Sequence, residues 1–253
     1  MPPNLLVFDF DGVIVDGMSE YWWSARRSCQ TLRPGIDLPQ ETPERFRQLR
    51  PWIHHGWEMV LIAALLSEPD GPLDRVGLSG FVRDYSAHCE AALARFGWDP
   101  ALLQQTLESV RADAVQADRG AWLALHQPYP GVVERLAAFT AEGLAWSVLT
   151  TKGRDFTAEL LSAMGLTPAR LDGHESGPKP QVLLRLAREW TLSGFVEDRR
   201  PTLETVRSTP GLENLPCWLV SWGYLRPTDA EGLPDGVRLL SAECFASPLA
   251  EWP

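Results

Sequence analysis

The stretch Leu5-Leu-Val-Phe-Asp-Phe-Asp-Gly12 decides the fold, because a continuous apolar run leads directly into two carboxylates and a glycine. The apolar run does not alternate with polar residues, which is typical of a strand buried on both faces of a parallel sheet. In open α/β sheets, ligands bind at the carboxyl ends of the strands. We therefore expect Asp9 and Asp11 to lie at a ligand-binding edge, with Gly12 allowing a sharp turn just past them.

The region between this strand and Pro128 has a different pattern, made of amphipathic stretches separated by Pro/Gly breaks. The predicted helices of this region are Ser19–Leu32, Trp57–Leu66, Leu78–Phe96 and Pro100–Leu125. From Pro128 onward, short apolar runs alternate with helical patterns. The predicted strands are 144–149, 194–198, 216–221 and 236–240, and the predicted helices are 132–142, 154–164, 180–190 and 201–208.

Alternating strands and helices of this length predict right-handed βαβ units around a parallel sheet. The predicted fold class is therefore α/β, a Rossmann-like parallel-sheet core into which an all-helical domain is inserted after the first strand. The predicted core comprises residues 1–16 and 128–253, and the predicted helical domain comprises residues 17–127.

Composition and charge exclude several classes of protein. The 253 residues carry a formal net charge of −10 without a basic cluster, which argues against nucleic-acid binding. The apolar run Val60–Leu66 is far too short to span a membrane, and the N-terminus does not resemble a signal peptide. The 4 cysteines are scattered, as expected of a protein in the reducing cytoplasm. We expect a cytoplasmic monomer or homodimer that binds a small molecule.

Three further motifs follow the first pair of carboxylates. Thr150 ends the apolar run 144–149 and is followed by Thr151, Lys179 stands between two prolines, and Glu197-Asp198 closes another predicted strand. Each motif alone has an ordinary explanation, such as a polar residue ending a strand, a solvated lysine or a helix cap. Together they place polar groups at the ends of several strands of one sheet.

In this order the four motifs resemble those of the haloacid dehalogenase (HAD) superfamily, and in particular its capped members similar to phosphoglycolate phosphatase and β-phosphoglucomutase. The resemblance covers the whole predicted core. The helical insert occupies the position of the family's cap domain, which closes over the site and selects the substrate. One departure is Thr202, because many relatives have a further acid four residues after the metal-binding aspartate.

The resemblance implies a role for each matching residue. Asp9 would attack phosphorus to form an aspartyl-phosphate, Asp11 would act as general acid and base, and Thr150 and Lys179 would stabilise the transferring phosphoryl group. Mg²⁺ would be held by Asp9, the Asp11 backbone carbonyl, Asp198 and Glu197, the last directly or through water.

Substrate contacts are expected from Gly12, from Thr151 and from Arg50 of the insert. A guanidinium suits an oxyanion, although Arg50 is equally compatible with a surface or capping role.

The predicted function is a Mg²⁺-dependent phosphatase that acts on a small phosphorylated metabolite. Asp11 argues against a dehalogenase, because a departing halide needs no proton. A phosphonatase would need a lysine in the insert, and residues 17–127 contain none. A phosphomutase of the β-phosphoglucomutase type remains an alternative, because it would keep the same motifs. A non-catalytic interaction protein with a HAD-like scaffold also remains open, although it would be expected to lose Asp9, Asp11 or Lys179.

Overall fold

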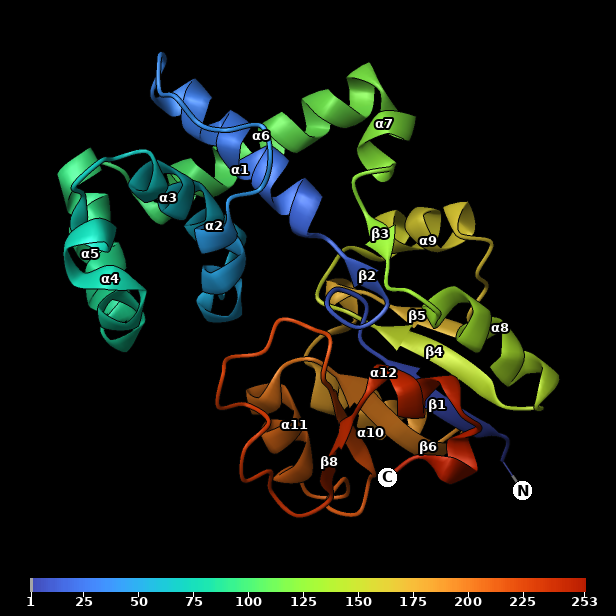
Figure 1. Cartoon of the computed structure of the whole chain (residues 1–253). Coiled ribbons are helices and arrows are strands. Elements are labelled where there is room, and N and C mark those ends of the chain that lie inside the picture. Colours follow the sequence, from blue (N-terminus) through green and yellow to red (C-terminus); the bar gives the residue numbers. More distant parts are fainter. Residues whose placement is uncertain (1) are drawn as a thin grey trace. The chain divides into compact units, whose positions relative to one another are not determined.

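The computed structural model describes residues 2–253 and divides the chain into two compact units (Figure 1). One unit contains the chain up to Asp16 together with Gln127–Pro253, and the other contains Gly17–His126. The first unit has a six-stranded sheet in the order β5-β4-β1-β6-β7-β8, and each neighbouring pair is parallel. The strands are β1 (Asn4–Phe8), β4 (Ala145–Leu149), β5 (Arg170–Asp172), β6 (Thr191–Glu197), β7 (Cys217–Val220) and β8 (Val237–Leu240).

The register places three strand ends at one edge of this sheet. Phe8 of β1 pairs with Val148 of β4 on one side and with Val196 of β6 on the other. Because all three strands run in the same direction, the residues that follow them emerge together. The predicted α/β core with a parallel sheet is confirmed.

Helices cover both faces of the sheet. Alternation along β1 directs Leu5 and Val7 to one face and Phe8 to the other. On the first face they share a buried cluster with side chains of α10 (Lys179–Leu186) and α11 (Arg200–Arg207). On the opposite face, Phe8 packs against α8 (Val132–Ala141) and α12 (Ala242–Ala246) through the rings of Phe139 and Phe245, with centroid distances of 6.0 and 6.3 Å. A further helix, α9 (Arg154–Ala163), connects β4 to β5.

A two-stranded ribbon marks the place where the chain leaves this unit and returns to it. Residues Val15–Asp16 form β2, which pairs in antiparallel fashion with Gln127–Pro128, or β3. Because the ribbon lies outside the six-stranded sheet, the insertion of more than 100 residues leaves the parallel register intact.

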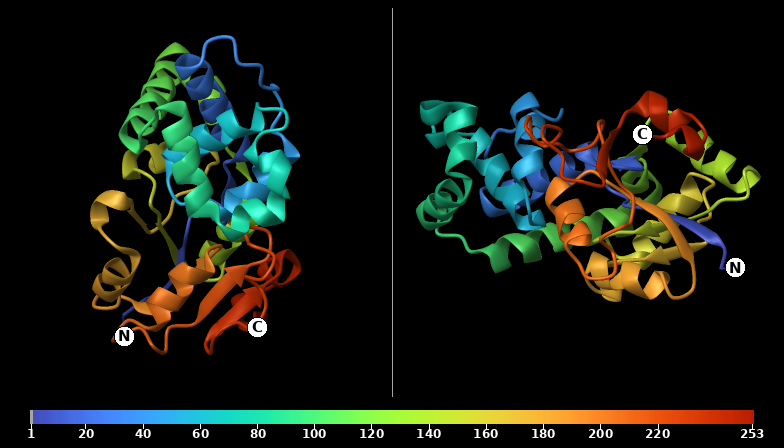
Figure 2. Two further views of the ribbon diagram at one scale, coloured as in Figure 1. Left: turned by 90° about the vertical axis from the view of Figure 1, so that its left-hand side faces the viewer. Right: turned by 90° about the horizontal axis from the view of Figure 1, so that it is seen from below.

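The second unit, Gly17–His126, contains helices and loops and no strand among its residues (Figure 2). Helix α3 is buried on nearly all sides and packs against α1 and α6, and a bidentate ion pair from Arg111 to Glu20 joins α6 to α1. The helices are α1 (Met18–Leu32), α2 (Glu44–Leu49), η1 (Arg50–Trp52), α3 (Gly56–Leu66), α4 (Pro72–Arg83), α5 (Tyr85–Phe96), α6 (Pro100–Ala117) and α7 (Arg119–Leu123).

Several predicted elements differ from the structure. The stretch 78–96 was expected to be one helix, but the chain breaks at Asp84, where φ is −118° and ψ is 38°, so α4 and α5 are separate. The stretch 100–125 breaks at Asp118, whose carboxylate accepts a hydrogen bond from the Ala121 N–H and begins α7. Helix α10 ends at Leu186, four residues before the predicted end.

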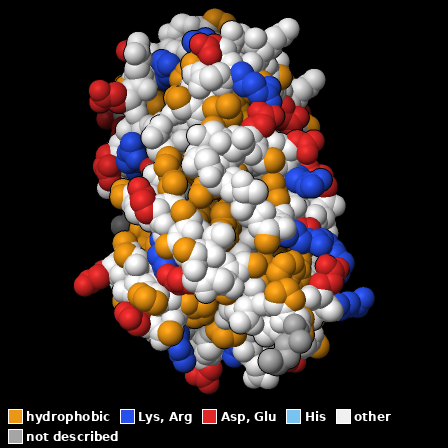
Figure 3. Space-filling view, turned by 90° about the vertical axis from the view of Figure 1, so that its right-hand side faces the viewer, with side chains coloured by type: hydrophobic (Ala, Val, Ile, Leu, Met, Phe, Trp, Pro, Cys, Tyr) orange, Lys and Arg blue, Asp and Glu red, His pale blue; other side chains and the backbone are white. Residues whose placement is uncertain are grey.

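The surface carries both signs of charge. On the face drawn in Figure 3, acidic and basic side chains are interspersed with apolar ones. Within residues 2–253, the search for a helix long and apolar enough to cross a membrane finds none.

Candidate active site

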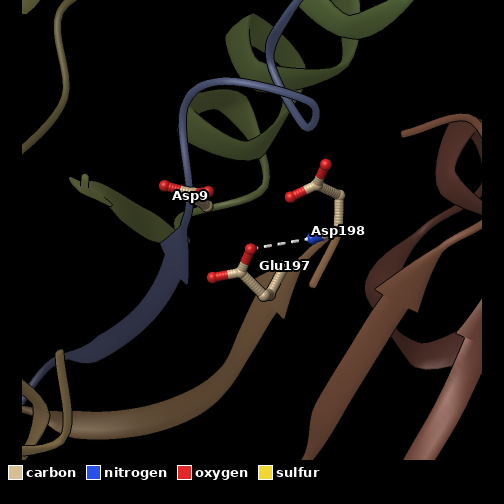
Figure 4. A group of neighbouring side chains, drawn as sticks. All are labelled: Asp9, Glu197 and Asp198. Carbon is tan, nitrogen blue, oxygen red and sulfur yellow. Dashed lines mark hydrogen bonds between the residues drawn. The ribbon is translucent and has the colours of Figure 1, made fainter. Parts of the chain in front are cut away.

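Three acidic side chains converge where β1 and β6 end (Figure 4). Asp9 follows β1, and its N–H donates to the Val196 carbonyl at 2.8 Å, which fixes the end of β1 against β6. Glu197 is the last residue of β6, and Asp198 follows it. All three side chains are buried, and carboxylate oxygens from the three lie within 4.8 Å of one another. The parallel sheet therefore brings together acids that are almost 190 residues apart.

Lys179 supplies the positive charge that balances part of this cluster. It is the first residue of α10, and the flanking prolines restrict the backbone that presents it. Its Nζ lies 2.8 Å from Asp9 Oδ1 and 2.6 Å from Glu197 Oε2, so one ammonium joins two carboxylates from different strands. This arrangement brings the predicted lysine and the predicted acids together in one place.

Asp9 and Glu197 share the single ammonium of Lys179, so these two buried carboxylates carry more negative charge than the lysine balances. Burial, followed by repulsion from Glu197, raises the pKa of Asp9 to about 7, although Lys179 acts in the opposite direction. Burial also raises the pKa of Glu197. Burial alone would lower the pKa of Lys179, but the adjacent carboxylates of Asp9 and Glu197 raise it above its ordinary value. The lysine is therefore held in its charged form, while Asp9 and Glu197 share that one positive charge.

The two oxygens of Glu197 already have partners in the chain. Oε2 contacts the lysine, and Oε1 accepts hydrogen bonds from the N–H groups of Asp198 and Arg199, each at 3.1 Å (Figure 4 shows the first of these). Glu197 thereby orients Lys179 and the turn after β6. The carboxylate of Asp198 has a different partner from that of Glu197, because its Oδ2 accepts a hydrogen bond from the Tyr224 N–H at 2.9 Å.

The residues of the cluster fit a hard divalent cation. Their donor atoms are all carboxylate oxygens, which Mg²⁺ prefers, and their excess negative charge gives a cation an electrostatic reason to bind. Asp9 and Asp198 are the better candidates as direct ligands, because both oxygens of Glu197 are occupied by the lysine and the backbone.

Gly12 is required by the shape of this site. It has a φ of +85°, and a Cβ at this position would lie 2.1 Å from Asp198 Oδ2. Its N–H donates to the Val15 carbonyl at 2.9 Å. The glycine leaves room for the Asp198 carboxylate beside the loop, and the substrate contact expected of Gly12 stays a prediction.

The predicted phosphate-binding threonine lies at the end of β4, the neighbour of β1. Thr150 is buried, its N–H donates to the Asp172 carbonyl at 2.9 Å, and its Oγ1 accepts the Lys152 N–H at 3.1 Å. Thr151 is exposed on the same turn. Asp11 extends from the loop after β1, with its side chain 18% exposed, and its Oδ1 lies 3.3 Å from Lys152 Nζ.

A further loop completes the site and was not predicted. It follows β7, where the Trp222 Nε1–H donates to the Val13 carbonyl at 3.1 Å and the Tyr224 N–H binds Asp198. A Cβ on Gly223 would lie 2.6 Å from the Gly12 carbonyl oxygen, so the two loops touch at paired glycines. The loop after β7 begins directly after a buried strand. This position was the signal in the sequence that could have identified the loop, as it was for the other motifs.

Arg50 is the one predicted site residue that belongs to the helical unit. It begins η1, and its guanidinium carbon lies 4.8 Å from the centroid of the Tyr21 ring. Its side chain is half-buried within that unit.

Comparison with known families gives one match that spans most of the chain. A family model described as haloacid dehalogenase-like hydrolase matches residues 3–199. Its range includes the ends of β1, β4 and β6 and the start of α10, where the acids, the threonine and the lysine lie.

Two curated proteins are similar to parts of the chain. A phosphoglycolate phosphatase of Thiobacillus denitrificans is 42% identical over 69 residues, which is 27% of this chain and 28% of that protein. Phosphoglycolate phosphatase 1 of Pseudomonas aeruginosa is 27% identical over 164 residues, which is 65% of this chain and 47% of that protein. The chain thus spans less than half the length of each of these relatives.

Solved structures share the fold over nearly the whole chain. A structure from Haemophilus somnus described as a predicted phosphoglycolate phosphatase has a TM-score of 0.63 at 19% identity, covering 96% of this chain and 95% of that one. A HAD-superfamily hydrolase of Geobacter sulfurreducens has a TM-score of 0.55 at 16% identity, covering 93% and 91% respectively.

Gly12→Ala tests the close approach of the first loop to Asp198. The added Cβ must displace the Asp198 carboxylate, so we expect loss of measurable Mg²⁺ binding by isothermal titration calorimetry. Gly143→Ala is the matched control, because Gly143 also has a positive φ, +74°, but a Cβ there meets no atom within 4 Å among the described residues. Equal Mg²⁺ binding by the two variants would contradict this role for Gly12.

Metal binding should depend on pH through Asp9. Because its pKa is raised to about 7, a divalent cation must displace a proton below that pH. We expect Mg²⁺ affinity to rise by about tenfold per pH unit below 7 and to level off above it. Calorimetric titrations between pH 5.5 and 8.5 measure this, and Asp9→Asn should abolish the dependence. An Mg²⁺ affinity that is constant over this pH range would contradict the prediction that Asp9 is protonated below pH 7.

Proposed function

Because the chain belongs to the haloacid dehalogenase-like hydrolase family, we propose that it is a phosphatase that hydrolyses a small phosphorylated metabolite through an aspartyl-phosphate. The family match confirms the resemblance found in the sequence. The observation that carries the proposed activity is the direct contact between Lys179 and Asp9, at 2.8 Å, inside a buried cluster of acids. Such a contact prepares a carboxylate to approach an anionic substrate.

In the first step we assign Asp9 as the nucleophile. One of its oxygens forms a bond to phosphorus while the bond from phosphorus to the ester oxygen breaks. Asp11 gives its proton to the departing oxygen, so the product leaves as an alcohol. Asp11 suits this role because it lies two residues from Asp9 and its side chain is accessible, whereas Asp9 is buried.

In the second step water completes the hydrolysis. Asp11, now a carboxylate, takes a proton from a water molecule whose oxygen attacks the phosphorus of the aspartyl-phosphate. The bond between phosphorus and Asp9 breaks, which releases inorganic phosphate and restores the carboxylate. Asp11 therefore returns to its protonated form, and each cycle consumes one ester and one water molecule.

Charge is the main obstacle to the first step. A carboxylate and one phosphate charge at 4 Å repel each other by about 4 kcal/mol at an effective dielectric constant near 20. Lys179 opposes this repulsion at the nucleophile. Thr150, at the end of β4, offers a hydroxyl to the phosphoryl oxygens, and the exposed Thr151 is a second donor on the same turn.

We assign Mg²⁺ binding to Asp9, Asp198 and the backbone carbonyl of Asp11. Glu197 contributes through Lys179 and the turn after β6, or through water. When bound, Mg²⁺ would supply positive charge that offsets the repulsion between the nucleophile and the phosphoryl oxygens. The surplus of negative charge in the cluster and its oxygen-only donor set support this assignment.

We further propose that residues 17–127 form the cap that selects the substrate. The support is their position in the chain, between the first and second strands of the parallel sheet, and the helical unit Gly17–His126, which includes all of these residues except Gln127 of β3. Arg50 is the residue of this unit that we assign to substrate binding, because a guanidinium can donate two parallel hydrogen bonds to the oxygens of a carboxylate or phosphate.

Hydrolysis is favoured over the alternatives. Both curated relatives are named as phosphatases, which supports hydrolysis rather than transfer within a mutase cycle. A non-catalytic interaction protein would have no need to bury three carboxylates around a lysine, since buried charges are costly to maintain.

Hydrolysis of p-nitrophenyl phosphate tests the two aspartates. Asp9→Asn should reduce kcat by about 10³-fold or more, since an amide cannot form the acyl-phosphate bond. Asp11→Asn should slow turnover by about 10²–10⁴-fold and allow phosphoenzyme to accumulate. Asp235→Asn, at an exposed position, is the matched control and should behave like the wild type. Turnover by Asp9→Asn at more than a tenth of the wild-type rate would refute the assignment of Asp9 as the nucleophile.

A further inference from the structure

A hollow lined by two arginines and by no acid lies beside the first residues of β7 and β8. Its volume is about 210 Å³, and its lining includes Arg207, Arg238, Asn214 and Gly236. The protein as a whole carries a net charge of −10, and a larger hollow of the helical unit is lined by three arginines together with three acids. The hollow beside β7 and β8 is therefore positively charged in a protein that is otherwise acidic.

This hollow and the acids of the candidate active site lie at opposite ends of α11. The helix begins two residues after Asp198 and ends at Arg207, and its 8 residues span about 12 Å along the helix axis. The hollow is also lined by Cys217, which begins β7, and by Gly236, which directly precedes β8. None of the residues that line the hollow belongs to the candidate active site.

The backbone holds the guanidinium of Arg207 in place. Its Nε and Nη1 groups donate to the carbonyls of Asp235 and Leu215, at 3.2 and 3.1 Å. A Cβ on Gly236 would lie 2.3 Å from Arg207 Cζ, so the guanidinium packs against the backbone of the turn before β8. Within residues 2–253 no carboxylate forms an ion pair with Arg207, and three of its five N–H donors have no partner.

Arg238 supplies a second guanidinium without a partner. It lies on β8, the last strand of the sheet, and it is exposed. Its side chain donates no hydrogen bond and forms no ion pair in the part of the chain that the structure describes, and the same is true of the Asn214 side-chain amide. The hollow thus gathers hydrogen-bond donors that the protein does not use for its own folding.

These groups fit a small oxyanion. A guanidinium can donate two parallel hydrogen bonds to the oxygens of a phosphate or a carboxylate. Two guanidiniums together match the charge of a phosphate dianion, whereas a carboxylate would balance only one of them. Pockets for drug-sized molecules have volumes of about 300–1,000 Å³, so this smaller hollow suits an ion or the phosphate end of a small ester.

We propose that this hollow is a second binding site, separate from the candidate active site, and that it binds a phosphate group through Arg207, Arg238 and Asn214. The second site goes beyond the proposed phosphatase activity and does not depend on it, because none of these three residues takes part in the proposed reaction.

Calorimetric titration with inorganic phosphate at pH 8 in the presence of EDTA tests the second site. EDTA removes divalent cations, so the acids at the candidate active site keep their negative charge and repel phosphate. We expect one phosphate to bind per chain. Arg238→Gln should weaken phosphate binding by at least tenfold, because it removes one charge from the hollow and no contact within the described residues.

Arg188→Gln is the matched control, and its affinity for phosphate should stay within twofold of the wild type. Arg188 is exposed in the same unit and forms no ion pair among residues 2–253, but it lies outside the hollow. The control therefore makes the same change in net charge. Phenyl phosphate, titrated in the same way, distinguishes the source of the phosphate group: binding as tight as that of inorganic phosphate assigns an ester, and weaker binding assigns the free ion.

A second measurement and a second variant cover the residue that also holds the backbone. Phosphate should raise the Tm of the wild type relative to chloride at equal ionic strength, because a ligand that binds only the folded protein stabilises it. Arg238→Gln should lose this rise in Tm. Arg207→Lys keeps the charge but cannot donate to two carbonyls and to a ligand at once, so the rise should also be smaller in this variant.

Three results would overturn the inference. Absence of phosphate binding by the wild type in EDTA would show that the hollow does not bind this ion. Equal weakening in Arg238→Gln and Arg188→Gln would show that phosphate responds to the net charge alone. Phosphate binding that is unchanged in Arg238→Gln would place the ion elsewhere in the protein.

Discussion

The site depends on one ammonium group that joins two buried carboxylates. Lys179 contacts Asp9 at the end of β1 and Glu197 at the end of β6, so it ties two adjacent strands together at the edge where chemistry is proposed. Buried charges of this kind are costly unless each is paired, and here Asp9 and Glu197 share one ammonium. Burial, followed by repulsion from Glu197, raises the pKa of Asp9, and a divalent cation would neutralise the negative charge of these acids. The sheet thus brings together the negative charges that are the reason for the proposed binding of Mg²⁺.

The backbone around this ion pair allows little variation. The loop after β1 and the loop after β7 approach each other at Gly12 and Gly223, and side chains at either position would collide with Asp198. Tyr224 connects these parts, since its N–H binds Asp198 and its hydroxyl donates to Asp16 at 2.8 Å. The parallel register and main-chain hydrogen bonds therefore fix the positions of the carboxylates.

Much of the core could be predicted from the sequence, because strands buried on both faces leave continuous apolar runs such as Leu5–Phe8. The polar residues that end these runs identified Asp9, Thr150 and Asp198. Strand β5 was missed because it has only three residues, two of them charged. The helix breaks at Asp84 and Asp118 were also missed, because the apolar periodicity continues across both.

Other features depend on side-chain direction, which spacing does not reveal. The use of both Glu197 oxygens by Lys179 and the backbone, and the contact between Lys152 and Asp11, arise only when distant segments meet. Arg50 lies in the separate helical unit, so the geometry of the sheet does not specify which group its guanidinium binds.

Identification of the phosphorylated residue tests most directly whether Asp9 is the carboxylate that bonds to phosphorus. The Asp11→Asn variant, incubated with Mg²⁺ and p-nitrophenyl phosphate and quenched in acid, should yield peptides for mass spectrometry. We expect one phosphoryl group on the peptide containing Asp9, removable by hydroxylamine as is typical of an acyl-phosphate. A phosphoryl group on another residue, or turnover without any phosphopeptide, would contradict it.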